Sequence, residues 1–184
     1  MTASMTSPTS VALERLIASI RSIVQAESDP EVIGAGVAEA LAPHLGNPDL
    51  LTDKQLVPDP NHYRQHILHV EPDGSFSIVA LVWLPGQETP IHDHVCWCVV
   101  GVHLGEEHET TYALAGSDDD PYLVVSGAPV NLNGSVAALV PPGDIHKVAN
   151  AGDDLAVSLH IYGADIGQLG SSIRRKYDVP VREA

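Results

Sequence analysis

The segment that decides the fold is Gly86–Gly105, which reads GQETPIHDHVCWCVVGVHLG. Side chains two residues apart on a strand point to the same side, so His92 and His94 can converge on one point. A third histidine, His146, lies within Gly134–Asn150, GSVAALVPPGDIHKVAN. Imidazole is a common ligand for iron, zinc, copper and nickel, and three imidazoles on one face leave coordination positions for a substrate. The sequence therefore predicts a metal site formed by His92, His94 and His146.

Both segments resemble the two sequence motifs of the cupins. The first has the spacing Gly86-x5-His92-x-His94-x3-Cys98-x6-Gly105, and the second has Gly134-x6-Pro141-x-Gly143-x2-His146-x3-Asn150, one residue longer in its first gap. Glycine and proline suit the tight corners of a small barrel. The resemblance implies an all-β fold, the cupin double-stranded β-helix or jelly-roll barrel.

The flanking sequence predicts two helices before the barrel. Apolar residues recur at helical spacing over 11–25, with Ser10 or Thr9 as N-cap, and Asp29-Pro30 begins a second helix that stops before Pro43. After Pro58, apolar segments broken by turn residues predict strands, with a hairpin turn at 71–74, a loop at 116–121 and a short C-terminal helix at 165–177. The predicted strands are 63–70, 76–84, 96–104, 108–114, 121–126, 136–140 and 155–162.

This pattern predicts a single catalytic domain with an N-terminal extension. Residues 1–10 are expected to be a flexible N-terminus, 11–57 a helical extension packed on the barrel, and 58–184 the cupin catalytic domain.

Composition excludes several classes of partner. The chain has 184 residues and a formal net charge of −15, which argues against nucleic acid and anionic membrane surfaces. No apolar run reaches the roughly 18 residues of a membrane span, and the first residues lack the pattern of a signal peptide. The two cysteines, Cys96 and Cys98, make no disulfide framework. We therefore expect a cytoplasmic protein.

The segments TPIHDHVCW, PPGDIHKVAN and VSLHIYG resemble the cupin thiol dioxygenases, the cysteine dioxygenase family and its bacterial 3-mercaptopropionate relatives. The resemblance covers roughly residues 60–165. It implies one Fe(II) held by His92, His94 and His146, and a small, carboxylate-bearing thiol oxidised by dioxygen to its sulfinic acid. Cupins usually carry Glu at Cys98, so the resemblance also implies a metal that keeps its full positive charge and attracts a thiolate.

The segment VSLHIYG supplies a second group of candidate residues. Ser158, His160 and Tyr162 alternate along one predicted strand and therefore share a face. They resemble the family's hydrogen-bond relay, in which the tyrosine hydroxyl points at the iron. In mammalian-type enzymes a cysteine at the position of Cys98 forms a thioether with that tyrosine. A Cys98–Tyr162 crosslink is one interpretation, and a small buried apolar residue at Cys98 is the other.

Substrate recognition departs from the family pattern. Mammalian-type enzymes hold the substrate carboxylate with an arginine near the start of the barrel, and the matching residue here is Gln65, as in the bacterial Gln-type enzymes. A shift of one residue would place Arg64 there instead. The arginine that Gln-type enzymes carry just after His-x-Tyr-Gly is missing, and Arg174 and Arg175 follow a few residues later. These two either hold the carboxylate by another route or are solvated.

Two other functions fit the same histidines. A nickel, manganese or zinc centre would support a non-thiol reaction, because geometry does not select among these metals. A non-catalytic cupin that binds a small ligand is the second alternative. The sequence does not predict an oligomeric state.

Overall fold

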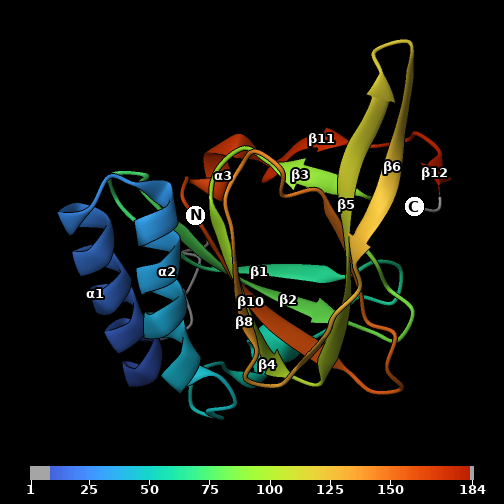
Figure 1. Ribbon diagram of the computed structural model, residues 1–184. Helices are drawn as coiled ribbons and strands as arrows, with labels where there is room; N and C mark the ends of the chain where they lie inside the picture. Colours follow the sequence, from blue (N-terminus) through green and yellow to red (C-terminus); the bar gives the residue numbers. More distant parts are fainter. Residues whose placement is uncertain (1–8, 183–184) are drawn as a thin grey trace, which may run out of the picture.

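The computed structural model describes residues 9–182 and shows two facing β-sheets with a pair of helices on one side (Figure 1). The flexible N-terminus predicted for residues 1–10 lies largely outside the described residues. The helices are α1 (Val11–Ala26), α2 (Pro30–Leu41) and α3 (Ile166–Leu169), with 3₁₀ turns at Ala42–His44 and Asp53–Leu56. The strands are β1 (Arg64–Val70), β2 (Ser77–Trp83), β3 (His92–His94), β4 (Cys98–Leu104), β5 (Glu106–Ser117), β6 (Asp120–Gly127), β7 (Val130–Leu132), β8 (Val136–Leu139), β9 (His146–Ala149), β10 (Ala156–Tyr162), β11 (Ile173–Lys176) and β12 (Val181–Arg182).

The two sheets have the topology of an all-β cupin barrel. One sheet has the order β1-β2-β10-β4-β8, and the other has β11-β3-β9-β5-β6-β12, with β7 paired to β5. Strands far apart in sequence therefore become neighbours, as β2 and β10 do over their full lengths. The two predicted cupin motifs meet at the pairing of β3 with β9, where His92 is directly opposite His146.

Strand β2 is buried on both of its faces. Ile78, Ala80 and Val82 pack in the cluster that contains the helical residues Leu16 and Leu41, whereas the alternate residues of the strand face the barrel interior. Because the side chains of a strand alternate between faces, a strand with both faces covered reads as a continuous apolar run. The helices α1 and α2 (blue in Figure 1) thus cover the outer face of the five-stranded sheet, and the barrel interior is left for the site.

Both predicted helix starts are confirmed. The Ser10 side chain accepts a hydrogen bond from the backbone N–H of Leu13, and Asp29 accepts one from Glu31 ahead of Pro30. These caps satisfy backbone donors that have no partner within the helix. The predicted 71–74 turn also forms, with the Gly74 N–H donating to the Glu71 carbonyl at 2.8 Å.

The predicted helix over 165–177 is wrong for most of its length. It ends at Leu169, because Gly170 takes a left-handed conformation with φ of 73°. Residues 173–176 instead form β11, which pairs with the otherwise open edge of β3. The predicted 116–121 loop is also shorter, since β5 runs to Ser117 and β6 starts at Asp120.

The strands β7, β9, β11 and β12 were not predicted, and β3 was expected only from the spacing of His92 and His94. All five have at most four residues. Such short segments carry little periodicity, so their pairing with neighbours decides their conformation. Among the described residues, no helix is both long enough and apolar enough to cross a membrane.

Candidate metal centre

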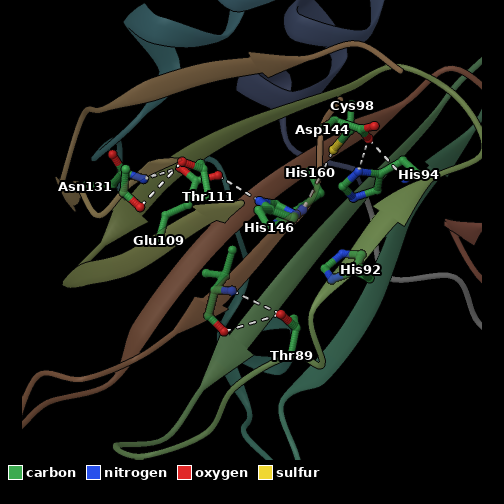
Figure 2. A network of polar contacts seen from close by, with 12 residues as sticks. Thr89, His92, His94, Cys98, Glu109, Thr111, Asn131, Asp144, His146 and His160 are labelled. Atoms are coloured by element: carbon green, nitrogen blue, oxygen red, sulfur yellow. Dashed lines mark hydrogen bonds and ion pairs between the residues drawn. The ribbon is translucent and has the colours of Figure 1, made fainter. Parts of the chain in front are cut away.

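His92, His94 and His146 come together inside the barrel as predicted. His92 and His94 flank Asp93 on β3, and His146 begins β9 directly opposite His92. The three ring centroids are 4.7–5.1 Å apart, and one ligand nitrogen from each ring lies within 4.8 Å of the others. All three residues are at most 5% exposed. This grouping, seen in Figure 2, can hold one metal ion.

The orientation of each imidazole is set by an oxygen atom behind it. Nδ1 of His92 lies 2.9 Å from the Pro90 carbonyl, Nδ1 of His94 lies 2.9 Å from Oδ2 of Asp144, and Nδ1 of His146 lies 2.7 Å from Oε1 of Glu109. Each Nδ1–H is therefore the donor, and each Nε2 keeps its lone pair for a metal. Burial, followed by the influence of His146, lowers the pKa of His92 to about 3, so this ring is neutral, as a ligand must be.

Two buried carboxylates lie directly behind this cluster, and the sequence did not reveal them. Burial tends to raise the pKa of Glu109 and of Asp144, but the hydrogen bonds from His146 and His94 prevail and lower both. Both groups are therefore ionised at neutral pH. The expectation of a metal that keeps its full positive charge stays a prediction, and a metal held by these histidines would have two anions one imidazole away.

Ser158, His160 and Tyr162 lie on β10, in the sheet that faces the histidine cluster. Ser158 Oγ is 3.0 Å from Nε2 of His160, and Nδ1 of His160 is 3.2 Å from the Tyr162 hydroxyl. The Tyr162 ring lies 6.3 Å from the His94 ring, centroid to centroid. The indole N–H of Trp83 donates to Ser158 Oγ at 3.2 Å and extends the chain further. The structure thus contains the continuous hydrogen-bonded row that the sequence predicted.

The protonation of this row follows from its burial. Burial, then the three neighbouring histidines, lowers the pKa of His160 well below 6.5, so its ring is neutral and carries one N–H. Burial raises the pKa of Tyr162 well above 10, which keeps the phenol protonated. The row can therefore pass a proton from one member to the next, but it holds no net charge of its own.

Cys98 lies on β4 directly opposite Tyr162 on β10, and both side chains are buried. Its sulfur is 4.0 Å from Nδ1 of His160, the same atom that Tyr162 contacts. Burial raises the pKa of the Cys98 thiol well above 9. Cys96 shares the interior cluster with Cys98, whereas Trp97 packs on the opposite, helix-covered side. Both cysteines are free, and the Cys98–Tyr162 crosslink stays a prediction.

The cavity beside the histidine cluster has room for a small ligand. The centre of a water molecule can move within about 60 Å³ of it. Gln65 lines it, whereas Arg64 lines only a neighbouring surface hollow, which Asp59, His62, Tyr63 and Gln65 also border. The remaining polar groups of the lining, besides the histidines and Tyr162, are Tyr63, Thr89, Ser171 and Ser172. Gln65, not Arg64, therefore faces the site.

Arg174 and Arg175 do not line this cavity. The Arg174 guanidinium binds Asp93, which also accepts a hydrogen bond from the Tyr177 hydroxyl at 2.8 Å. Asp93 points away from the histidine cluster, because alternate residues of a strand face opposite sides. Arg175 lies over the Tyr177 ring at 4.7 Å. The structure thus gives both arginines a role outside the cavity, and the prediction that they hold substrate finds no support in their placement.

Several site residues escaped the sequence reading. Asp144 stands two residues before His146 in the second motif, so its position was a usable signal. Glu107 and Glu109 alternate on β5 and are both buried, yet in sequence they look like part of a solvated acidic strand. Thr89, Ser171 and Ser172 come from loops whose approach to the cavity only the fold determines.

Comparison with solved structures finds cupin barrels of low similarity. An uncharacterised conserved protein with a double-stranded β-helix domain from Klebsiella pneumoniae has 16% identity and a TM-score of 0.47, covering 61% of this chain and 86% of its own. A cupin 2 conserved barrel domain protein from Salinispora arenicola has 22% identity and a TM-score of 0.43, with coverages of 61% and 84%. A cupin superfamily protein from Desulfitobacterium hafniense has 17% identity and a TM-score of 0.46, with coverages of 66% and 95%.

The comparison with family models is more informative. The model described as cysteine dioxygenase type I matches residues 3–171. The matched region contains the three histidines, Cys98 and the row from Ser158 to Tyr162, and it ends before Arg174. The match indicates dioxygenase chemistry at a three-histidine site, with a small substrate and dioxygen as reactants. The chain belongs to the cysteine dioxygenase type I family.

Proposed function

We propose that the protein is an iron-dependent thiol dioxygenase that converts a small thiol and dioxygen to the sulfinic acid. The overall reaction, RSH + O2 → RSO2H, is balanced without a further reductant. The observation that carries the proposal is the cluster of three imidazoles whose Nδ1 atoms each face a hydrogen-bond acceptor, with a buried phenol across a small cavity. Fe(II) bound there would supply coordination positions for the thiolate and dioxygen and the electrons that activate oxygen.

The chain's own residues would position the reactants. Tyr162, held by His160, presents a protonated hydroxyl that can donate a hydrogen bond into the cavity. The apolar residues Leu81, Val148 and Ile173 line one part of the same cavity, whose lining is otherwise largely polar. The reacting sulfur and oxygen would thus meet the oriented Tyr162 hydroxyl within a small cavity.

The far end of the thiol would be held by neutral groups. The cavity lining includes the Gln65 amide and the hydroxyls of Tyr63 and Ser172, and no lysine or arginine is among its residues. A carboxylate held by a guanidinium gains about 1.5–3 kcal/mol, against about 0.5–1.5 for a neutral hydrogen bond. We therefore expect that exchanging a carboxylate for a hydroxyl on the substrate changes kcat/KM by less than about tenfold.

The test is oxygen consumption by iron-loaded protein with cysteine, cysteamine, 3-mercaptopropionate and mercaptosuccinate, extended by 2-mercaptoethanol. The expected result is consumption of one O2 for each sulfinate formed with at least one of these thiols. The matched control is His146→Ala, which should lose both iron and activity. Iron-loaded protein that consumes no oxygen with any thiol, or full activity with nickel, manganese or zinc in place of iron, would overturn the proposal.

A further inference from the structure

Glu107 on β5 is a buried carboxyl group that the proposed reaction does not use. It is 1% exposed, and its Oε1 has no hydrogen-bond partner among the described residues. Leaving a buried polar atom unpaired is unfavourable, so its persistence calls for an explanation. Glu107 lines a small internal cavity in which the centre of a water molecule has about 10 Å³ available. This is roughly enough space for one water molecule.

The surroundings of Glu107 connect it to the end of the row farthest from the metal site. Hydrogen bonding by the side chains of Ser158 and Trp83 acts on the pKa of its carboxyl group, so these two residues are its polar neighbours on the row. Glu109 and His146 also line the small cavity, and its remaining polar residues, Asn131 and Ser135, do not titrate. The strands β4 and β8 contribute only apolar side chains there, including Val100, Val102 and Leu139. Ser158 is thus the member of the row through which Glu107 can act.

The hydrogen bonds of the row allow two arrangements. The Trp83 N–H can only donate, so Ser158 Oγ accepts from it. In the first arrangement the Ser158 hydroxyl donates to Nε2 of His160, Nδ1–H donates to the Tyr162 oxygen, and the phenol proton points into the cavity. In the second, Nε2–H donates to Ser158, Tyr162 donates to Nδ1, and the Ser158 proton must go elsewhere.

We propose that Glu107 is a positioning residue that selects between these arrangements. An ionised Glu107 accepts the Ser158 proton and favours the second arrangement, in which the phenol proton is turned toward His160. A protonated Glu107 donates to Ser158 Oγ and favours the first, in which the phenol proton is available in the cavity. Each step only reorients hydrogen bonds or moves a proton to an adjacent atom, so no oxidant or reductant is involved.

The charge state of Glu107 lies in the range where such a selection takes place. Burial raises its pKa to about 7, against the opposing hydrogen bonds of Ser158 and Trp83. The group is therefore neutral below about pH 7 and ionised above it. Since His160 stays neutral, the change appears as a tautomer exchange of its ring and not as a gain of charge.

The test measures the His160 tautomer directly, by 15N NMR of the full chain loaded with diamagnetic Zn2+. In the wild type we expect the His160 ring to carry its proton on Nδ1 at about pH 5.5 and on Nε2 at about pH 8.5. Glu107→Gln cannot titrate and should hold one tautomer at both values, and Ser158→Ala, which removes the connection, should do the same. The matched control is Glu106→Gln, the adjacent and more exposed carboxyl on β5, which should follow the wild type.

The catalytic consequence rests on the proposed function and has a separate readout. From about pH 5.5 to about pH 8.5, the kcat of the iron-loaded wild type should fall about tenfold or more relative to the kcat of iron-loaded Glu107→Gln. The KM for the thiol should be the same in both proteins. A wild-type tautomer that does not change with pH, or one that still changes in Glu107→Gln, would overturn the assignment of Glu107. Absence of thiol oxidation with a normal tautomer exchange would refute the proposed function alone.

Discussion

Glu109→Gln isolates the contribution of the charge behind the metal site. The Glu109 carboxylate accepts the Nδ1–H of His146 at 2.7 Å and a hydrogen bond from the Asn131 amide at 3.2 Å. Glutamine keeps an oxygen that can accept from His146, and the Asn131 amide can rotate to match it. The imidazole therefore stays oriented while the negative charge is lost.

The size of the effect follows from the type of hydrogen bond. A hydrogen bond to a charged acceptor contributes about 1.5–3 kcal/mol, and a neutral one about 0.5–1.5 kcal/mol. The difference, near 1.4 kcal/mol, corresponds to about tenfold in a dissociation constant. This agrees with the loss of about 10–100-fold in metal affinity on changing groups that hydrogen-bond to metal ligands.

The assay is competition for Fe2+ or Zn2+ against a chelator of known affinity, under anaerobic conditions for iron. Glu106→Gln removes a charge from the same strand at a side chain that is 38% exposed, and it should bind metal as the wild type does. Thermal unfolding of the metal-free proteins shows whether both variants remain folded. A metal affinity of Glu109→Gln within about twofold of the wild type would refute the reasoning that this carboxylate stabilises the bound cation.

Three further outcomes are expected. Tyr162→Phe removes the hydroxyl that contacts Nδ1 of His160 and should lower kcat about 10²-fold while metal affinity stays unchanged; equal losses in both would contradict the assigned role. Gly101→Ala should lower stability by about 1–3 kcal/mol in thermal unfolding, because the added Cβ would lie 2.7 Å from the Leu41 side chain of α2; an unchanged melting temperature would mean that the helix moves freely. The hydrogen bond from Arg21 is the main cause of the lowered pKa of Glu71, so the stability it contributes is present above the ordinary pKa of 4.5 and is lost as the pH falls below that value. Glu71→Gln should flatten that part of the acid-stability profile, and an identical profile would show that the pair does not contribute.

The sequence alone was sufficient for the fold class and for the three histidines of the candidate metal centre. His92 and His94 are two residues apart, and a strand places such residues on one face whatever its neighbours are. The motif around His146 completed the set, and the structure brings these rings to centroid distances of 4.7–5.1 Å. The alternation of Ser158, His160 and Tyr162 predicted their shared face by the same local rule.

The tertiary structure alone decided what lies behind and opposite these residues. Glu109 and Asp144 lie 37 and 50 residues from their histidine partners in the sequence, and only the packing of the barrel brings each pair into hydrogen-bond contact. The influence of Ser158 on the pKa of Glu107 likewise arises only because the two sheets face each other. Arg174 looked available for a substrate, but the pairing of β11 with β3 turns it to Asp93. A side chain's direction along one strand is a property of the backbone, whereas its partners depend on which strands meet and in what register, and that information is spread over the whole chain.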